Sequence, residues 1–405
     1  MNDDFTACGM YVFCGSQSIA HLNCGWNVKE ILEMTEDMTE YNAYHFKKNY
    51  PNIPIYKPSE WSQNSFLNTL KGKQYKLLYA NNPCSGLSSI NKNANVNQPI
   101  NNRFFEVFNV IDKIEPESFL IENAPTLVTI GTPILHKMVD LLSNKYKFTI
   151  IRDMAGNHGV AMKRLRTMII GWNKKSFNNR IPLIHMNIEP KVALKDVLGT
   201  IDNNALNADD ENYNLFNNVS ELYKNIPYGK TILYECCKEF DTIKDKLTST
   251  QLKSVTTLKN KLDNNLHGWD KSPFKPDPNK QAPSITSLTR LIHPIENRNL
   301  YIREYARIMG YPDDFKFYEK SNDEDSCKCS SIQCIAQGVP VKFIEWISKE
   351  IKRCFENNYE IIGEENIDVV FQQHTYKRCF KFTKDEFFNT SILNNVNKDY
   401  IPLNQ

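Results

Sequence analysis

The sequence predicts an α/β fold: a mainly parallel, Rossmann-like sheet with a smaller domain inserted into it. Short apolar runs of strand character alternate with amphipathic helical patterns between residues 71 and 172, which is typical of βαβ units. From about residue 196 to 283 the alternation gives way to an Asn- and Lys-rich region with short helical patches, and regularity returns at residue 284. A chain of 405 residues with 41% hydrophobic content can bury a large core and form two domains.

Composition narrows the functional classes. The formal net charge is only +2, so nucleic-acid binding would depend on a local basic face and not on overall charge. The N-terminal residues MNDDFTACGMYVFCGSQ do not combine a basic start with an apolar core, and no stretch approaches a membrane span. The 11 cysteines are scattered, and Cys327, Cys329 and Cys334 lack an obvious fourth ligand, so we expect reduced thiols and no metal site.

The N-terminal segment has the pattern that opens a Rossmann-like unit. Tyr11–Phe13 is predicted as a short buried strand, Gly15 follows in a tight turn, and a helix is expected to end near Cys24–Trp26. In such a unit the backbone approaches a bound cofactor at the glycine turn. The usual second and third glycines are missing from this turn.

An acidic cluster follows the next predicted strand, Lys29–Met34. Glu36 and Asp37 come directly after Thr35, at the place where Rossmann-like folds hold ribose hydroxyls. A solvated acidic loop would give the same pattern, so both interpretations stay open at this point.

The stretch LLYANNPCSGLS, residues 77–88, places a cysteine where a strand ends. Its apolar run stops at two asparagines, and Pro83 and Cys84 then lead into a loop that contains Ser and Gly. A second strand-like run, Ser118–Ile121, ends at Glu122. A thiol and an acid at neighbouring strand ends suggest covalent catalysis. A buried cysteine that only fills space is the alternative.

Two helices and two further strands complete the alternating region. Each helix has one apolar face: the first is formed by Phe104, Val107, Phe108 and Ile111, and the second by Leu135, Met138, Val139 and Leu142. Strands are expected at Phe148–Ile151 and Thr167–Ile170, in a mainly parallel sheet whose functional groups gather at the carboxyl ends of the strands.

Arg164 and Arg166 precede the last strand two residues apart, so they point to the same side and suit oxygen acceptors. Solvated charges at a sheet edge are the alternative.

The C-terminal part contains two more predicted helices. One lies within Arg298–Phe315 and is closed by Gly310. The other follows a Gly-Val-Pro turn and has Ile344, Ile347 and Ile351 on one face. Beyond residue 352 the sequence is mixed and polar, and it indicates no role.

Taken together, these segments resemble the cytosine-C5 methyltransferases that act on DNA, in order and over nearly the whole chain. The blocks that carry the resemblance are Phe13-Cys14-Gly15, Pro83-Cys84, Glu122-Asn123, Arg164 with Arg166, Arg303-Glu304 through Gly310-Tyr311-Pro312-Asp313-Asp314-Phe315, and Val339-Pro340. No single block is specific, whereas their order and spacing together are.

The resemblance implies a Rossmann-like, S-adenosylmethionine-dependent methyltransferase fold. Residues 1–195 and 284–352 would form the catalytic domain, residues 196–283 the inserted target-recognition region, and residues 353–405 an extension of unknown role.

The chemistry implied by the resemblance is covalent catalysis on a cytosine flipped out of duplex DNA. The Cys84 thiolate would add to C6, Glu122 would hold and protonate N3, and Arg166 would bind O2 as charge develops there. C5 would then take the methyl group of S-adenosylmethionine, and loss of the C5 proton would release Cys84. Asn123 and Arg164 would hold the acid and the loop in place.

The resemblance also implies a set of cofactor contacts. These are Phe13 on the adenine, Gly15 near the methionine part, Asp37 or Glu36 on the ribose, and Pro83 and Gln337 as further lining of the site. The expected partner is double-stranded DNA, with no membrane and no metal, and we expect a monomer. The expected location is the cytoplasm for a bacterial or phage protein, for example in a restriction-modification system, or the nucleus in a eukaryote.

Four departures from the family pattern keep three hypotheses open. Ser85 and Met162 stand where the family usually has Gln, Ala336-Gln337-Gly338 replaces its Gly-Asn, and the cofactor loop lacks its second glycine. Because the thiol, the acid and Arg166 remain, an active DNA cytosine-C5 methyltransferase is the favoured hypothesis. The alternatives are a transfer-RNA cytosine-C5 methyltransferase and a nucleic-acid-binding regulatory protein without catalysis.

Overall fold

The computed structural model describes residues 4–37, 43–88, 91–200, 216–264, 272–287, 289–317, 331–356, 359–373 and 378–389. Its strands are β1 (Thr6–Met10), β2 (Asn27–Leu32), β3 (Ile55–Tyr56), β4 (Leu77–Asn81), β5 (Ser118–Asn123), β6 (Tyr146–Met154), β7 (Leu165–Asn173), β8 (Ile181–Pro182), β9 (Ile361–Gly363), β10 (Val369–Gln373) and β11 (Arg378–Phe382). Its α-helices are α1 (Ser16–Asn23), α2 (Ala43–Asn49), α3 (Pro58–Trp61), α4 (Asn64–Gly72), α5 (Asn102–Ile114), α6 (Thr132–Leu142), α7 (Leu194–Leu198), α8 (Ile232–Lys238), α9 (Phe240–Ile243), α10 (Ser249–Asp263), α11 (Ile302–Met309), α12 (Ser331–Gln337), α13 (Val341–Phe355) and α14 (Lys384–Asn389).

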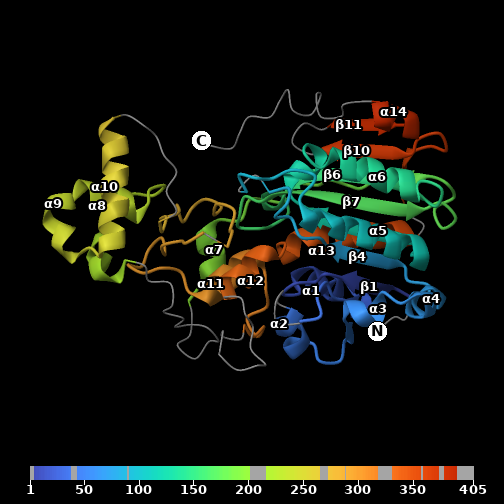
Figure 1. Ribbon diagram of the computed structural model, residues 1–405, viewed down its shortest axis with the longest axis horizontal. Coiled ribbons are helices and arrows are strands. Elements are labelled where there is room, and N and C mark those ends of the chain that lie inside the picture. The colour runs from blue at the N-terminus through green and yellow to red at the C-terminus, as the bar shows by residue number, and fades with distance from the viewer. Residues whose placement is uncertain are drawn as a thin grey trace.

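A nine-stranded sheet organises the molecule, in the order β11-β10-β6-β7-β5-β4-β1-β2-β3 (Figure 1). The strands from β3 to β5 run parallel, β7 is antiparallel to both of its neighbours, and β10 is again parallel to β6. The predicted α/β class with a mostly parallel, Rossmann-like sheet is therefore confirmed. The strands β4 and β5 lie side by side, so their carboxyl ends meet at one edge of the sheet.

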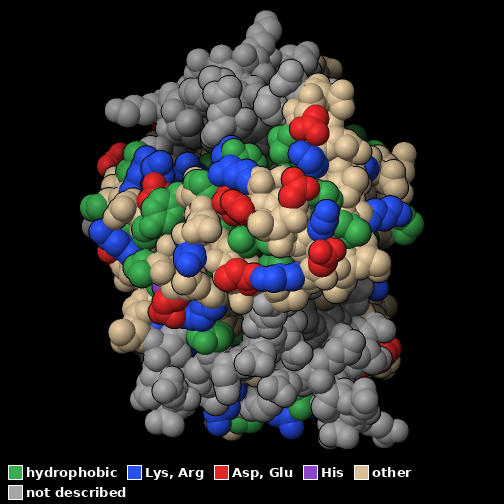
Figure 2. All heavy atoms as spheres, turned by 90° about the vertical axis from the view of Figure 1, so that its left-hand side faces the viewer, with side chains coloured by type: hydrophobic (Ala, Val, Ile, Leu, Met, Phe, Trp, Pro, Cys, Tyr) green, Lys and Arg blue, Asp and Glu red, His purple; other side chains and the backbone are tan. Residues whose placement is uncertain are grey.

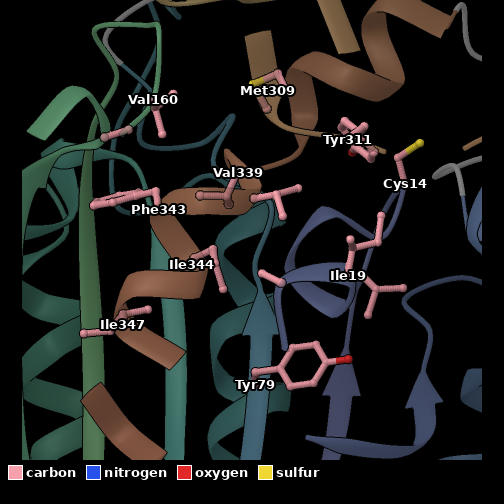
Figure 3. Packing of buried hydrophobic residues seen from close by; sticks show 14 of the residues in the cluster. Cys14, Ile19, Tyr79, Val160, Met309, Tyr311, Val339, Phe343, Ile344 and Ile347 are labelled. Atoms are coloured by element: carbon pink, nitrogen blue, oxygen red, sulfur yellow. The ribbon is translucent and has the colours of Figure 1, made fainter. Parts of the chain in front are cut away.

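Two apolar layers cover the sheet, one on each face. On one face α1 and α13 pack through residues such as Ile19, Ile344 and Ile347, which gather above the strand that carries Tyr79 (Figure 3). Side chains of α4, α5, α6 and α14 fill the opposite face. Along β4 the side chains alternate between the two layers, with Tyr79 on the α1 side and Ala80 on the other.

The first strand begins earlier than predicted. The strand expected at Tyr11–Phe13 is wrong: β1 ends at Met10, and the backbone then turns, with positive φ at Tyr11 (56°) and Phe13 (50°). Such φ values do not fit a strand. The helix that follows, α1, ends as predicted just before Cys24, and α11 ends as predicted at Gly310, whose φ is 81°.

A separate small core supports the helical region between residues 216 and 264. It combines residues of α8 and α10 with those of a 3₁₀ helix over Asn217–Asn225, and it includes Ile292 from the following segment. This helical unit lies to one side of the sheet (Figure 1). On the face shown in Figure 2, Lys and Arg side chains are interspersed with acidic ones. The lysines of this unit include Lys246, which pairs with Glu221, and Lys259 of α10, which pairs with Asp263.

The extension beyond residue 352 completes the sheet, a contribution that the sequence did not indicate. Strand β10 pairs with β6, and β11 forms the outer edge. Lys147 fixes the turn that leads into β10: it is 1% exposed, and its Nζ donates to the carbonyls of Glu364 (3.1 Å), Glu365 (2.7 Å) and Ile367 (2.8 Å). Burial lowers the pKa of Lys147 from its ordinary value.

Replacing Lys147 with Met is expected to lower the free energy of unfolding by about 2 kcal/mol, because the carbonyls of Glu364, Glu365 and Ile367 lose a charged donor. Denaturant unfolding measures this change. Lys145→Met is the matched control, since Lys145 pairs with Asp112 and Glu115 at the surface, where such pairs contribute about 0–1 kcal/mol. Equal losses in the two variants would contradict the assigned role of Lys147.

No helix in these described ranges is long and apolar enough to cross a membrane.

Candidate active site

Cys84 lies just beyond the carboxyl end of β4, next to the end of β5. The two strands are in parallel register, with Asn81 opposite Glu122, and Cys84 follows three residues after Asn81. The backbone then turns sharply, since the Leu87 amide donates to the Cys84 carbonyl at 3.0 Å. Cys84 is half-buried, unlike the fully buried Cys8. A reactive thiol must be partly exposed, whereas a cysteine that only fills space in the core is fully buried.

Glu122 and Arg166 form an ion pair beside this loop. Nε of Arg166 lies 2.8 Å from Oε1 of Glu122, and Glu122 is only 3% exposed. Burial raises the pKa of Glu122, and the nearby Arg166 and Arg164 charges partly oppose that rise. An acid with a raised pKa keeps its proton to higher pH, which is the property a proton donor needs.

Asn123 links the acid strand to the nucleophile loop. Its Nδ2 donates to the carbonyl of Asn82 at 3.0 Å, and its Oδ1 accepts from the Ala124 amide at 2.9 Å. Asn82 directly precedes Pro83-Cys84, so this contact restrains the backbone that delivers the thiol.

Arg164 connects the sheet to the C-terminal part of the chain. Its guanidinium donates to the carbonyls of Ile285 (2.7 Å), Ala336 (2.8 Å) and Gly338 (2.8 Å). Burial lowers the pKa of Arg164 from its ordinary value, and the neighbouring Arg166 cation lowers it further. Arg164 therefore joins segments far apart in sequence around the site.

Two of the departures from the family pattern have a structural explanation. The sulfur of Met162 accepts a hydrogen bond from the Ile285 amide at 3.1 Å, an acceptor role that an amide oxygen could also fill. Gly338 lies so close to α1 that a Cβ there would sit 2.6 Å from Ser16 Oγ, so only glycine fits. Ser85 is exposed at the turn, and its carbonyl accepts from Asn91 Nδ2 at 2.9 Å.

The turn between β1 and α1 contains the residues predicted to contact a cofactor at the N-terminus. Gly15 has φ of 91°, and a Cβ there would lie 2.2 Å from Phe46 Cδ2. Phe13 is 5% exposed. Pro83 and Gln337 lie at the other predicted positions, after β4 and at the end of α12.

Glu36 and Asp37 do not lie at the end of β2, because that strand ends at Leu32 and not at Met34. The exposed Glu36 carboxylate accepts from the amide (2.6 Å) and hydroxyl (2.8 Å) of Ser59. The acid at the strand end is Glu33, which the sequence interpretation missed. It is 1% exposed, and its Oε2 has no hydrogen-bond partner among the residues that the structure describes. A strand boundary two residues earlier would have pointed to it.

Burial raises the pKa of Glu33 from 4.5 to about 7. A raised carboxyl pKa means that stability is fully present below pH 4.5 and is lost as the pH rises through about 7. The shift corresponds to a loss of roughly 3 kcal/mol by pH 8. Glu33→Gln is expected to remove this part of the decline when the free energy of unfolding is compared at pH 5 and pH 8. An unchanged decline in the variant would assign the pH dependence to other groups.

The residues present fit S-adenosylmethionine. Its ribose hydroxyls need a buried acceptor, and Oε2 of Glu33 is one. The positive φ of Gly15 (91°) allows the tight turn from β1 into α1 at which Rossmann-like folds bind a cofactor. No group of three His, Cys, Asp or Glu that could hold a metal exists among the residues of the described ranges, and Cys327 and Cys329 lie outside them. Cys334 contacts His45, with Sγ 3.2 Å from Nε2.

The mostly parallel sheet, with the candidate site at the carboxyl ends of β4 and β5, defines a Rossmann-like α/β protein. Residues 13–353 match the family of C-5 cytosine-specific DNA methylases, and the chain belongs to this family of S-adenosylmethionine-dependent DNA methyltransferases.

The chain is similar to known proteins over most of its length. It is 22% identical to the type II methyltransferase M.DdeI of Desulfomicrobium norvegicum, over 89% of this chain and 91% of that protein. It is 25% identical to M.FnuDI of Fusobacterium nucleatum, over 70% of this chain and 78% of that one. A candidate DNA modification methyltransferase from an Escherichia coli prophage has the same fold, with a TM-score of 0.58 at 19% identity, covering 87% of this chain and 100% of its own.

Proposed function

We propose that this protein methylates C5 of a cytosine flipped out of duplex DNA, through a covalent bond between Cys84 and C6 of the base. The observation that carries the proposal is the position of Cys84 beside the ion pair of the buried Glu122 with the partly exposed Arg166, at the common edge of β4 and β5. A nucleophile, a proton donor and a cation for a developing oxyanion are thereby available within one small region.

The proposed mechanism assigns one step to each side chain. The Cys84 thiolate adds to C6, and the electron pair moves through the ring toward N3 and O2. Glu122 donates its proton to N3, and Arg166 stabilises the charge on O2. S-adenosylmethionine, when bound, supplies the methyl group that C5 takes. A base then removes the C5 proton, the bond between C6 and sulfur breaks, and Cys84 leaves as a thiolate.

Positioning in this proposal depends on Asn123 and Arg164. Asn123 restrains the backbone before Pro83, and Arg164 restrains the connection between α12 and α13. Both act on the site through other residues. For the cofactor we assign the adenine to Phe13, the ribose to Glu33 in place of Glu36 or Asp37, and further lining to Gly15, Pro83 and Gln337.

The domain division forms part of the same proposal. Residues 1–195 and 284–352 act as the catalytic domain, while the helical unit within residues 196–283 reads the target, and the lysines on its surface provide phosphate contacts. The extension from residue 353 stabilises the sheet through β10 and β11. The type II relatives favour a bacterial restriction-modification setting, with the enzyme acting in the cytoplasm as a monomer.

The test is transfer of tritium from methyl-labelled S-adenosylmethionine to duplex DNA or to transfer RNA, followed by bisulfite sequencing of DNA from cells that express the protein. Label on DNA, together with target cytosines that resist bisulfite conversion, supports the proposal. Label on transfer RNA alone would support the RNA enzyme instead. No transfer to either, together with binding to DNA, would support a protein without catalysis.

A further inference from the structure

Gln17 is a buried amide without a partner in the first turn of α1. It is 0% exposed, and neither Nε2 nor Oε1 has a hydrogen-bond partner within the described part of the chain. Its two neighbours are both satisfied: Ser16 Oγ accepts from the Val339 amide at 3.0 Å, and Ser18 Oγ accepts from Tyr79 Oη at 2.8 Å. A buried unpaired amide is costly, so native proteins keep one only where something else pairs with it.

Helical side chains lean toward the start of their helix, so the side chain of Gln17 is expected on the side of α1 that faces the turn at Gly15. The first backbone N–H groups of a helix have no partner within the helix, and they carry the positive end of its dipole. The unpaired side-chain amide of Gln17 therefore lies at a helix end whose first backbone N–H groups also need acceptors from outside the helix.

A second carboxamide, with one unpaired group, closes the neighbouring strand β4. Asn81 is 2% exposed, and its Nδ2 has no partner in the described residues. It closes β4 on the same face as Tyr79, since side chains alternate along a strand. Tyr79 contacts the first turn of α1 through Ser18. Figure 3 shows Tyr79 below α1, which carries Ile19.

We propose that Gln17, assisted by Asn81, binds the amino-acid end of S-adenosylmethionine, an inference that rests on the proposed function. That end carries a carboxylate and an ammonium group. A carboxamide presents a donor and an acceptor, so Nε2 can donate to the carboxylate while Oε1 accepts from the ammonium group. The N-terminus of α1 favours the same carboxylate. Gln17 thus compensates for the glycine that the cofactor loop lacks.

Calorimetric binding of two ligands to Gln17→Met tests this assignment. S-adenosylhomocysteine contains the amino-acid end, whereas 5′-methylthioadenosine lacks it. The variant is expected to bind S-adenosylhomocysteine about 10- to 100-fold more weakly than the unchanged protein, and to bind 5′-methylthioadenosine within about twofold of it. Without ligand, Gln17→Met is expected to melt at the same or a higher temperature, because an unpaired buried amide has been replaced by an apolar group.

Gln372→Met is the matched control. Gln372 is also a buried glutamine, but it lies in β10, from which β6, β7 and β5 separate β4, and its Nε2 already donates to the Ile184 carbonyl at 3.0 Å. Its replacement should leave both affinities unchanged. Unchanged S-adenosylhomocysteine binding in Gln17→Met, equal weakening of both ligands, or a lower melting temperature without ligand would each overturn the inference. Failure of the unchanged protein to bind S-adenosylhomocysteine would overturn the proposed function instead.

Discussion

Cys84→Ala is expected to lower the rate of methyl transfer by about 10⁴-fold or more, because without the thiol no covalent bond to C6 can form and activate C5. Transfer of tritium to duplex DNA measures the rate. Duplex DNA with 5-fluorocytosine in the target site measures the covalent step separately. Fluorine cannot leave as the C5 proton does, so the unchanged protein should remain attached to the DNA while Cys84→Ala should not.

The control for this experiment is Cys379→Ala. Cys379 is an exposed thiol on β11, at the outer edge of the sheet, and its loss should leave both rate and adduct unchanged. Melting temperatures of both variants show whether they fold. An adduct that persists in Cys84→Ala but disappears in Cys379→Ala would mean that the nucleophile has been assigned to the wrong cysteine.

The sheet could be predicted from sequence where local patterns carried the information. Strands β4 and β5 are continuous apolar runs, and α5, α6 and α13 have clear helical periodicity, so their order alone gave the mostly parallel topology. The juxtaposition of Cys84 and Glu122 followed from that topology, because parallel neighbours end at the same edge of a sheet.

Other features could not be predicted, because they depend on contacts distant in sequence. Strand β1, with the sequence TACGM, has a single β-branched residue, Thr6 at its start, and takes its strand conformation from β2 and β4 on either side. Strand β10 pairs with β6, more than 200 residues earlier in the chain, as the contact of Lys147 with Glu365 also illustrates (a separation of 218 residues). No local pattern reports such pairing.

The acid that follows β2 was missed for a smaller reason. Strand ends are the least certain part of a sequence interpretation, and an error of two residues at the end of β2 shifted attention from Glu33 to Glu36 and Asp37. The difference matters chemically: Glu33 is buried with a free oxygen in the described structure, whereas Glu36 is exposed and already bonded to Ser59.

Glu122→Gln is expected to lower the rate of methyl transfer by about 10²- to 10⁴-fold, because an amide can hydrogen-bond to N3 but cannot give it a proton. The dependence of the methyl-transfer rate on pH tests whether Glu122 acts as the proton donor. Burial raises the pKa of Glu122, so the unchanged enzyme keeps the active, protonated form to higher pH than an exposed glutamate would, and its rate falls as the pH rises through that pKa. This falling limb should be absent from the profile of Glu122→Gln.

Arg166→Met extends the same test by changing the environment of the acid and not the acid itself. The Arg166 cation lowers the pKa of Glu122, so its removal should move the falling limb to higher pH even as the rate drops through loss of the O2 contact. Glu106→Gln is the control, since Glu106 also pairs with an arginine, Arg103, and should leave rate and profile unchanged. A limb that stays fixed in Arg166→Met would show that Glu122 is not the group that titrates, and the role of proton donor would then belong to another residue.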